Sequence, residues 1–243
     1  MQELLIDRIS KQFEILSSIE DSFILRQCIE PKKTERMISY KNDVEQGADE
    51  RSLKSQKYFN YCKQYIAFFQ CRSYQFLFED YSLGRFVYEF DEWNTLNSAS
   101  LYWNPCPLNP EFIWELENSG FDVMEYIDSF AEKEKIELDH ISLRTPIRLD
   151  YTRDYNDKNI EYHPEYHMHY QHKDTRAMTK NILSLYGYML FILENCYPLF
   201  YRENEEKIER LRKLEKESLQ GFKIRRSKNN GMGNKIYTCI GIK

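Results

Sequence analysis

The chain has 243 residues, with 34 Lys or Arg and 39 Asp or Glu, so its formal net charge is −5. Glycine (8) and proline (7) are scarce and aromatic residues make up 15% of the chain, which excludes collagen-like, low-complexity and wholly disordered proteins. A chain of this length buries a large core without a structural metal or a disulfide.

The N-terminus and the cysteines predict a cytoplasmic protein. The first seven residues carry acids where a signal peptide carries Lys or Arg, and the most apolar stretch, 183–196, is too short to span a membrane. Because the apolar stretch is short, we expect no membrane partner. The six cysteines form no C-x-x-C pair, so we expect reduced thiols.

The N-terminal part of the chain predicts one helix and a loop. Apolar residues recur at three- and four-residue steps between Leu5 and Phe23, which places them on one face of a helix. Pro31 ends this predicted helix, and the charged segment 32–56 is expected to be a loop.

Strands bracketed by helices are predicted for the rest of the chain. Alternating apolar residues predict five strands, of which the first two form a hairpin: 74–79, 86–90, 98–103, 141–151 and 162–171. Helical periodicity predicts three helices, of which the last is highly charged: 121–134, 175–196 and 203–220. Two more strand-like runs, 222–226 and 235–242, flank an Asn/Gly-rich turn.

This order of elements predicts an α+β protein with a mainly antiparallel sheet of about five strands flanked by helices. We expect three parts: an N-terminal helix and charged loop (1–57), an α+β core (58–200), and a charged helix with a small basic β-hairpin (201–243).

Histidines are the most informative residues of the sequence. Four of the five fall within ten residues, 163–172. On a strand, His163, His167 and His169 share parity, so their side chains leave the same face. Because the residues that alternate with His167 and His169 are apolar, we expect those residues to face the core and the two histidines to project outward or into a cleft.

An imidazole pair supplies one base and one acid near neutral pH, which is what a metal-independent ribonuclease needs. One group deprotonates the 2′-OH, the other protonates the leaving 5′-oxygen, and a cation stabilises the charge of the phosphorane. His167 and His169 are the candidate acid and base, Arg148 or Arg144 is the candidate cation, and Asp150 is the candidate that orients an imidazole. The sequence therefore favours a nuclease, preferably for RNA, that requires no cofactor.

Other interpretations of the same residues stay open. His-x-His on a strand presents two nitrogens to one metal ion, with His163, Asp150 or Glu165 to complete the site, and the spacing does not choose the metal. Asp150 and Glu165 are also similar to the paired carboxylates of Mg²⁺ nucleases, although His167 stands where those enzymes carry Lys. The histidines could instead be hydrogen-bonded residues of a polar strand face without a catalytic role.

The last segment, 221–243, contains six Lys or Arg and no acid. Such a charge asymmetry attracts phosphate. The candidate nucleic-acid contacts are therefore four residues just before the turn and one after it, together with Arg144 from the predicted strand 141–151: Lys223, Arg225, Arg226, Lys228 and Lys235. A solvated hairpin, or a surface that docks on an acidic partner, are the alternatives.

Several stretches together resemble an uncharacterised bacterial family, domain of unknown function 2290, over about residues 58–200. They are 74–83, 101–107, 147–151, His163-Pro164-x-x-His167-x-His169, Arg176, 191–193 and 197–198. Tyr81 replaces the Gly expected in the family's turn, which suggests a looser turn. The family name implies no activity.

More loosely, Arg148-x-Asp150 followed by His167-x-His169 looks like the pattern of TumE-type toxins from toxin–antitoxin modules. This resemblance implies a ribonuclease-like toxin or an antiviral-defence effector. The alternatives are a non-enzymatic partner or regulatory subunit encoded in a defence or toxin–antitoxin operon, and a metal-binding protein that uses His163, His167 and His169.

These functions depend on one geometric prediction. Strands 141–151 and 162–171 should be adjacent and antiparallel, because sequential strands joined by one loop usually pair. Arg148 and Asp150 would then lie on the same sheet face as His163 and His167. Arg176, just beyond, would reach the same cleft, so His163 and Arg176 complete the candidate catalytic set.

Overall fold

An antiparallel sheet forms the centre of the computed structural model, which describes residues 4–18, 24–41, 61–130, 140–142, 144–153, 166–170, 176–178 and 184–219. Seven strands run in the order β1-β4-β5-β6-β7-β8-β9; β3 pairs with β5, and β2 pairs with β3. The strands are β1 (Leu25–Cys28), β2 (Lys32–Lys33), β3 (Met37–Ser39), β4 (Phe76–Phe78), β5 (Leu83–Phe90), β6 (Leu96–Asn104), β7 (Ile147–Thr152), β8 (Tyr166–Tyr170) and β9 (Arg176–Met178). The α+β class is thus confirmed, with more strands than expected because several are only two to four residues long.

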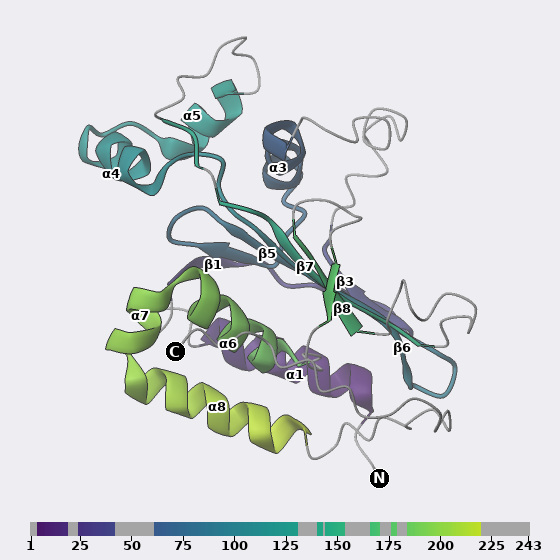
Figure 1. Ribbon diagram of the computed structural model, residues 1–243. Helices are drawn as coiled ribbons and strands as arrows, with labels where there is room; N and C mark the ends of the chain where they lie inside the picture. The colour runs from purple at the N-terminus through teal and green to yellow at the C-terminus, as the bar shows by residue number, and fades with distance from the viewer. Residues whose placement is uncertain are drawn as a thin grey trace.

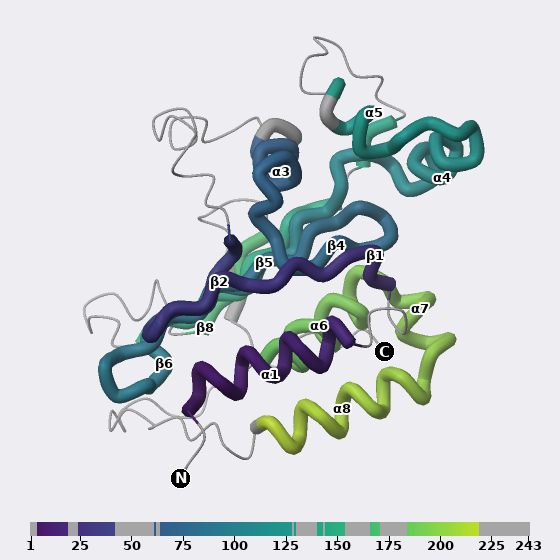
Figure 2. The backbone as a smooth tube through the Cα atoms, turned by 180° about the vertical axis from the view of Figure 1, so that it is seen from behind, coloured from purple at the N-terminus to yellow at the C-terminus, as the bar shows by residue number. Residues whose placement is uncertain are grey.

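Helices cover both faces of this sheet (Figure 1). They are α1 (Leu5–Ser18), α3 (Tyr61–Gln70), α4 (Pro110–Asn118), α5 (Val123–Phe130), α6 (Leu185–Cys196), α7 (Pro198–Glu203) and α8 (Glu205–Leu219). Figures 1 and 2 show α1, α6 and α8 on one side of the sheet, with α8 farthest from it, whereas α3 lies on the opposite side, with α4 and α5 beyond one end of the sheet. Two apolar cores match these layers, one under α1 and α6 and one between α3, α4 and α5.

The larger core follows from the apolar stripe of α1 and the apolar sequence of α6. Ile9, Phe13 and Leu16 lie one helical turn apart and are buried, as the periodicity predicts. They meet one face of the central strands, where Phe86 is fully buried and its ring lies 6.0 Å from that of Phe13. The hydroxyl of Ser184 caps α6 by accepting a hydrogen bond from the Gly187 amide at 2.9 Å.

The predicted hairpin is confirmed as β4 and β5, which pair antiparallel. In the turn between them, Tyr81 has φ 61°, a left-handed conformation that glycine adopts more easily. The Tyr81 side chain is nevertheless buried, and its hydroxyl donates to Glu117 at 3.2 Å, so packing holds the tyrosine in this turn. The third predicted strand is β6, which pairs with β5 along its whole length.

Two expectations for the N-terminal region are wrong. The first helix, described as Leu5–Ser18, does not continue to Pro31, because the chain from Leu25 forms β1 along the edge of β4. The segment 32–56 is also not entirely a loop, since β2 and β3 form at its start and β3 pairs with β5. Pairing with an existing sheet stabilises short strands whose own sequences carry little strand signal.

The C-terminal half differs from expectation in where its elements begin and end. The helix predicted for 175–196 begins only at Leu185, and Arg176–Met178 instead forms β9 beside β8. The helix predicted for 121–134 is α5, described as Val123–Phe130. The strand predicted for 141–151 runs from Ile147, after Ile141 makes only an isolated bridge to Leu108. The predicted basic hairpin, 222–242, lies outside the described residues.

Candidate functional site

The candidate site lies on two neighbouring strands, β7 and β8. They pair antiparallel, with Arg148 opposite His169 and Asp150 opposite His167. Residues directly opposite each other in an antiparallel pair share a face, as do alternate residues of one strand. All four side chains therefore leave the same face, and we call Arg148, Asp150, His167 and His169 the His–Asp cluster. The strand pairing and the shared face follow the geometric prediction.

One oxygen of Asp150 is the meeting point of the His–Asp cluster. Asp150 Oδ2 lies 2.7 Å from Arg148 Nε, 3.2 Å from His169 Nε2 and 3.6 Å from His167 Nε2. The other oxygen, Oδ1, accepts a hydrogen bond from the Ser100 hydroxyl at 2.7 Å. The two imidazole rings are nearly perpendicular, with centroids 4.7 Å apart.

The burial of the cluster differs from expectation. His167 and His169 are only 1% and 5% exposed, whereas Tyr170, which was expected to face the core, is 39% exposed. Met168 does face the larger core. The expectation of outward-facing histidines assumed that only one face of this strand is buried, but both faces are covered at His167–His169. Arg148 is the most solvent-exposed member of the cluster, with a side chain that is 38% exposed.

The carboxylate of Asp150 is held in its ionised form. Burial by itself raises the pKa of Asp150, but the nearby His169 and Arg148, together with the Ser100 hydroxyl, outweigh burial and place the pKa below its usual range. An ionised carboxylate beside two imidazoles stabilises whichever imidazole becomes protonated.

His169 has unused hydrogen-bonding capacity. Both of its ring nitrogens are buried, and neither makes a hydrogen bond of good geometry with the described residues. Its Nε2 is within ion-pair distance of Asp150 but is not aligned for a hydrogen bond. Buried polar atoms without a partner are costly in a purely structural role, so this arrangement favours a chemical role.

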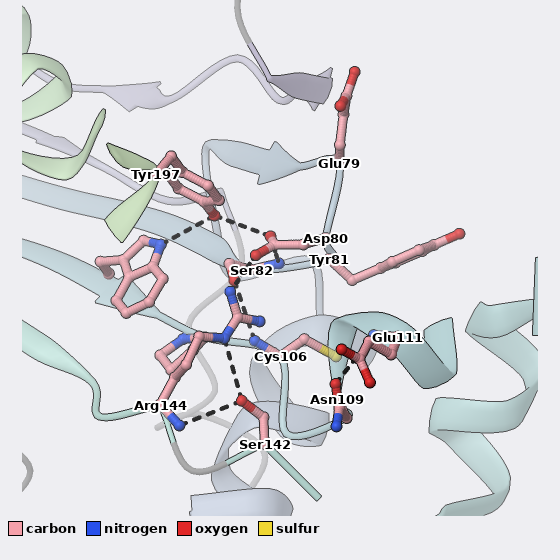
Figure 3. A network of polar contacts seen from close by, with 12 residues as sticks. Glu79, Asp80, Tyr81, Ser82, Cys106, Asn109, Glu111, Ser142, Arg144 and Tyr197 are labelled. Atoms are coloured by element: carbon pink, nitrogen blue, oxygen red, sulfur yellow. Dashed lines mark hydrogen bonds and ion pairs between the residues drawn. The ribbon is translucent and has the colours of Figure 1, made fainter. Parts of the chain in front are cut away.

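Arg144 lies in a different network, seen in Figure 3. Its Nη1 pairs with the Asp80 carboxylate, and its Nε donates to the Ser142 hydroxyl at 3.2 Å. The Tyr197 hydroxyl also donates to Asp80, at 2.9 Å. Arg144 therefore belongs to the Asp80 network and not to the His–Asp cluster. Arg148 is the cation of that cluster.

Other predicted site residues are placed only partly or not at all. Arg176 lies opposite His169 on β9, so its backbone is adjacent to the cluster, and its reach into the cleft stays a prediction. The remaining predicted residues lie outside the described part of the chain and stay predictions: His163, Lys223, Arg225, Arg226, Lys228 and Lys235.

Strand β6 also contributes to the site, which was not predicted from the sequence. Ser100 lies opposite Asp150, and Tyr102 lies opposite Arg148. The signal was available, because Ser100 and Tyr102 alternate with buried apolar residues in a predicted strand. This signal could be used only once β6 was known to pair with β7. The two strands are far apart in the sequence, because α4 and α5 lie between them.

A separate open cleft of about 530 Å³ lies beside the Asp80 network. Its lining is Arg26, Glu79, Asp80, Pro110, Ile113, Trp114 and Glu117, and includes no member of the His–Asp cluster. Arg26 is already paired with Glu117 at 2.7 Å, so the cleft offers mainly carboxylates and an exposed tryptophan. This chemistry does not suit a phosphate.

The His–Asp cluster can support two kinds of chemistry. Its imidazoles and carboxylate can move a proton, while Arg148 holds an anion at the exposed side. Asp150, His167 and His169 also offer three metal-ligand atoms that all lie within 4.8 Å of one another. These are the donor types that transition metals accept.

Comparison with known proteins gives a family but no activity. No described helix is both long and apolar enough to cross a membrane. No curated protein and no solved structure matches the chain, and the looser similarity to TumE-type toxins is not shown. A model of the uncharacterised conserved protein family DUF2290 matches residues 24–230, which is most of the chain and includes the whole His–Asp cluster, so the chain belongs to this family.

Proposed function

We propose that this chain is a nuclease that cleaves RNA at the His–Asp cluster, without a metal ion. The observation that carries the proposal is the convergence of two imidazoles and one guanidinium on a single ionised carboxylate. A base, an acid and a cation are the three groups that cleavage by an internal 2′-hydroxyl requires.

The geometry supports a role for each residue. His169 is the general base, because its Nε2 is the closer imidazole nitrogen to Asp150, whose charge stabilises the imidazolium that forms. His167 is the general acid. Arg148 contacts the phosphate, since it is the most exposed member of the cluster.

The reaction balances with these groups alone. His169 takes the proton of the 2′-OH, O2′ forms a bond to phosphorus, the bond from phosphorus to O5′ breaks, and His167 gives its proton to O5′. The products are a 2′,3′-cyclic phosphate and a 5′-hydroxyl. DNA lacks the 2′-OH and is therefore not a substrate.

A role in toxin–antitoxin or antiviral defence belongs to the same proposal. A nuclease of this kind would need a partner encoded in the same operon to restrain it, and the basic segment 221–243 would contact the RNA or that partner.

The test is cleavage of end-labelled RNA by the purified full chain in the presence of EDTA. We expect RNA to be cut to fragments that end in 2′,3′-cyclic phosphate, and DNA of the same sequence to remain intact. Arg148→Ala should cleave about 10²-fold more slowly or worse, while Arg212→Ala, the same substitution at an exposed position on α8, should match the wild type. RNA left intact with and without divalent metals would refute the nuclease, and cleavage that EDTA abolishes would refute the metal-free reaction.

A further inference from the structure

We propose that Asp150, His167 and His169 also form a binding site for one divalent transition-metal ion of the Zn²⁺ type, and that Arg148 forms an ion pair with Asp150 when the ion is absent. The inference goes beyond the proposed function, because binding can be measured without RNA. It is carried by the positions of the three donor atoms.

Two of the three separations between donor atoms are close to those that a single ion requires. Ligands about 2.1 Å from one ion lie about 3.0–3.4 Å apart at octahedral or tetrahedral angles. Asp150 Oδ2 lies 3.2 Å from His169 Nε2 and 3.6 Å from His167 Nε2. All three atoms lie within 4.8 Å of one another, so side-chain rotations would bring them onto one ion.

The surroundings hold these donors in place. Ser100 donates to Asp150 Oδ1, which fixes the carboxylate and leaves Oδ2 facing the two imidazoles. The histidines stand two residues apart on β8, which is hydrogen-bonded to β7 and to β9. His169 is only 5% exposed, and its Nε2 lacks a well-aligned hydrogen bond among the described residues, so a bound ion would give this nitrogen a well-placed partner.

The donor set selects the class of ion. Two imidazoles and one carboxylate suit Zn²⁺, Fe²⁺ or Ni²⁺, whereas Mg²⁺ and Ca²⁺ prefer oxygen ligands. Three protein donors leave at least one position for water.

Arg148 competes with the ion. Its Nε lies 2.7 Å from the same Oδ2 that would bind the metal, and two cations that close to each other repel. The Arg148 side chain is 38% exposed, so it can move into solvent when an ion enters. Removing its charge should therefore raise the affinity for metal, which is the opposite of what loss of a structural residue would do.

Metal binding would also switch off the proposed reaction, and this consequence alone rests on the proposed function. A bound ion takes Nε2 of His167 and of His169 as ligands, and its positive charge disfavours a further proton on either ring. Zn²⁺ should therefore inhibit metal-free cleavage of RNA, and chelation should restore it.

The test is calorimetric titration of Zn²⁺ into the full chain, purified without an affinity tag and treated with a chelator. We expect one equivalent to bind to the wild type in the presence of excess Mg²⁺. Binding should weaken at least about 100-fold in His169→Ala and in Asp150→Asn, tighten about tenfold in Arg148→Ala, and remain unchanged in His140→Ala, a histidine that stacks on Phe112 outside the cluster. Circular dichroism of each variant checks its fold, and the conservative Asp150→Asn keeps the test valid if His169→Ala does not fold.

Two results would overturn the inference. One is less than about a tenth of an equivalent of bound Zn²⁺. The other is full binding by both His169→Ala and Asp150→Asn, which would place the ion elsewhere on the chain. Because the readout is heat and stoichiometry, a protein that binds Zn²⁺ but leaves RNA intact would refute only the proposed nuclease.

Discussion

Asp150→Asn is expected to slow RNA cleavage by about 10²–10⁴-fold. The amide is nearly the same size as the carboxylate and can still accept the hydrogen bond from Ser100. It cannot stabilise a protonated imidazole, and it leaves Arg148 without its charge partner at 2.7 Å. Single-turnover rates on a labelled RNA measure the effect.

Asp7→Asn is the matched control, because Asp7 lies on α1, outside the cluster, and forms an exposed ion pair with Lys33 of β2. It should cleave at the wild-type rate. A rate for Asp150→Asn within about threefold of the wild type would remove Asp150 from the reaction.

The same substitution should change how stability depends on pH. The pKa of Asp150 in the folded chain lies below its usual range, so its favourable interactions are present above the unfolded-state pKa and are lost as the pH falls through the folded-state pKa. The asparagine side chain of the variant does not titrate. Urea unfolding at several acidic pH values should therefore show a smaller loss of stability on acidification for Asp150→Asn than for the wild type.

Phe86→Ala is expected to lower the free energy of unfolding by about 3–5 kcal/mol, the largest effect on stability that we predict. Phe86 is fully buried on β5, and its ring packs against those of Phe13, Phe76 and Tyr88 with centroids 6.0, 5.8 and 5.9 Å away. Truncation removes a large apolar surface and leaves a cavity between the sheet and α1, which rigid neighbours cannot fill.

Urea unfolding measures this loss, with Trp93→Ala as the control. Trp93 is also a large aromatic residue but is 79% exposed, so its truncation should change stability by no more than about 0.5 kcal/mol. If Phe86→Ala does not fold, Phe86→Leu should still fold with a smaller loss. A loss below about 1 kcal/mol for Phe86→Ala would show that this core does not carry the fold.

The pairing that forms the candidate site could be predicted because it depends on local patterns. Residue parity assigns the side chains of a strand to its two faces, and a single connection between strands favours their pairing. These two facts were enough to place Arg148 and Asp150 on the same sheet face as His167 and His169, whereas the register, with Arg148 opposite His169, lies farther along β8 than expected. The contact of Ser100 with Asp150 could not be foreseen, because it depends on strands that are far apart in the sequence.

The burial of the histidines and the start of α6 were not predicted correctly from the sequence. His167 and His169 are polar, so their pattern predicts an exposed face, but the sheet is covered on that side as well. The segment around Arg176 carries helical periodicity, yet it forms β9 because β8 offers an open edge. Ser184, which caps α6, was the local signal for the true start of that helix.

The central claim is that the residues of the His–Asp cluster act as one reaction centre, and a double-mutant cycle on RNA cleavage tests it most directly. Rates are measured for the wild type, Asp150→Asn, His169→Ala and the double variant under the same single-turnover conditions. If Asp150 acts through His169, the double variant should be no slower than the slower single variant. If the two losses instead multiply in the double variant, the residues act independently and the claim is contradicted.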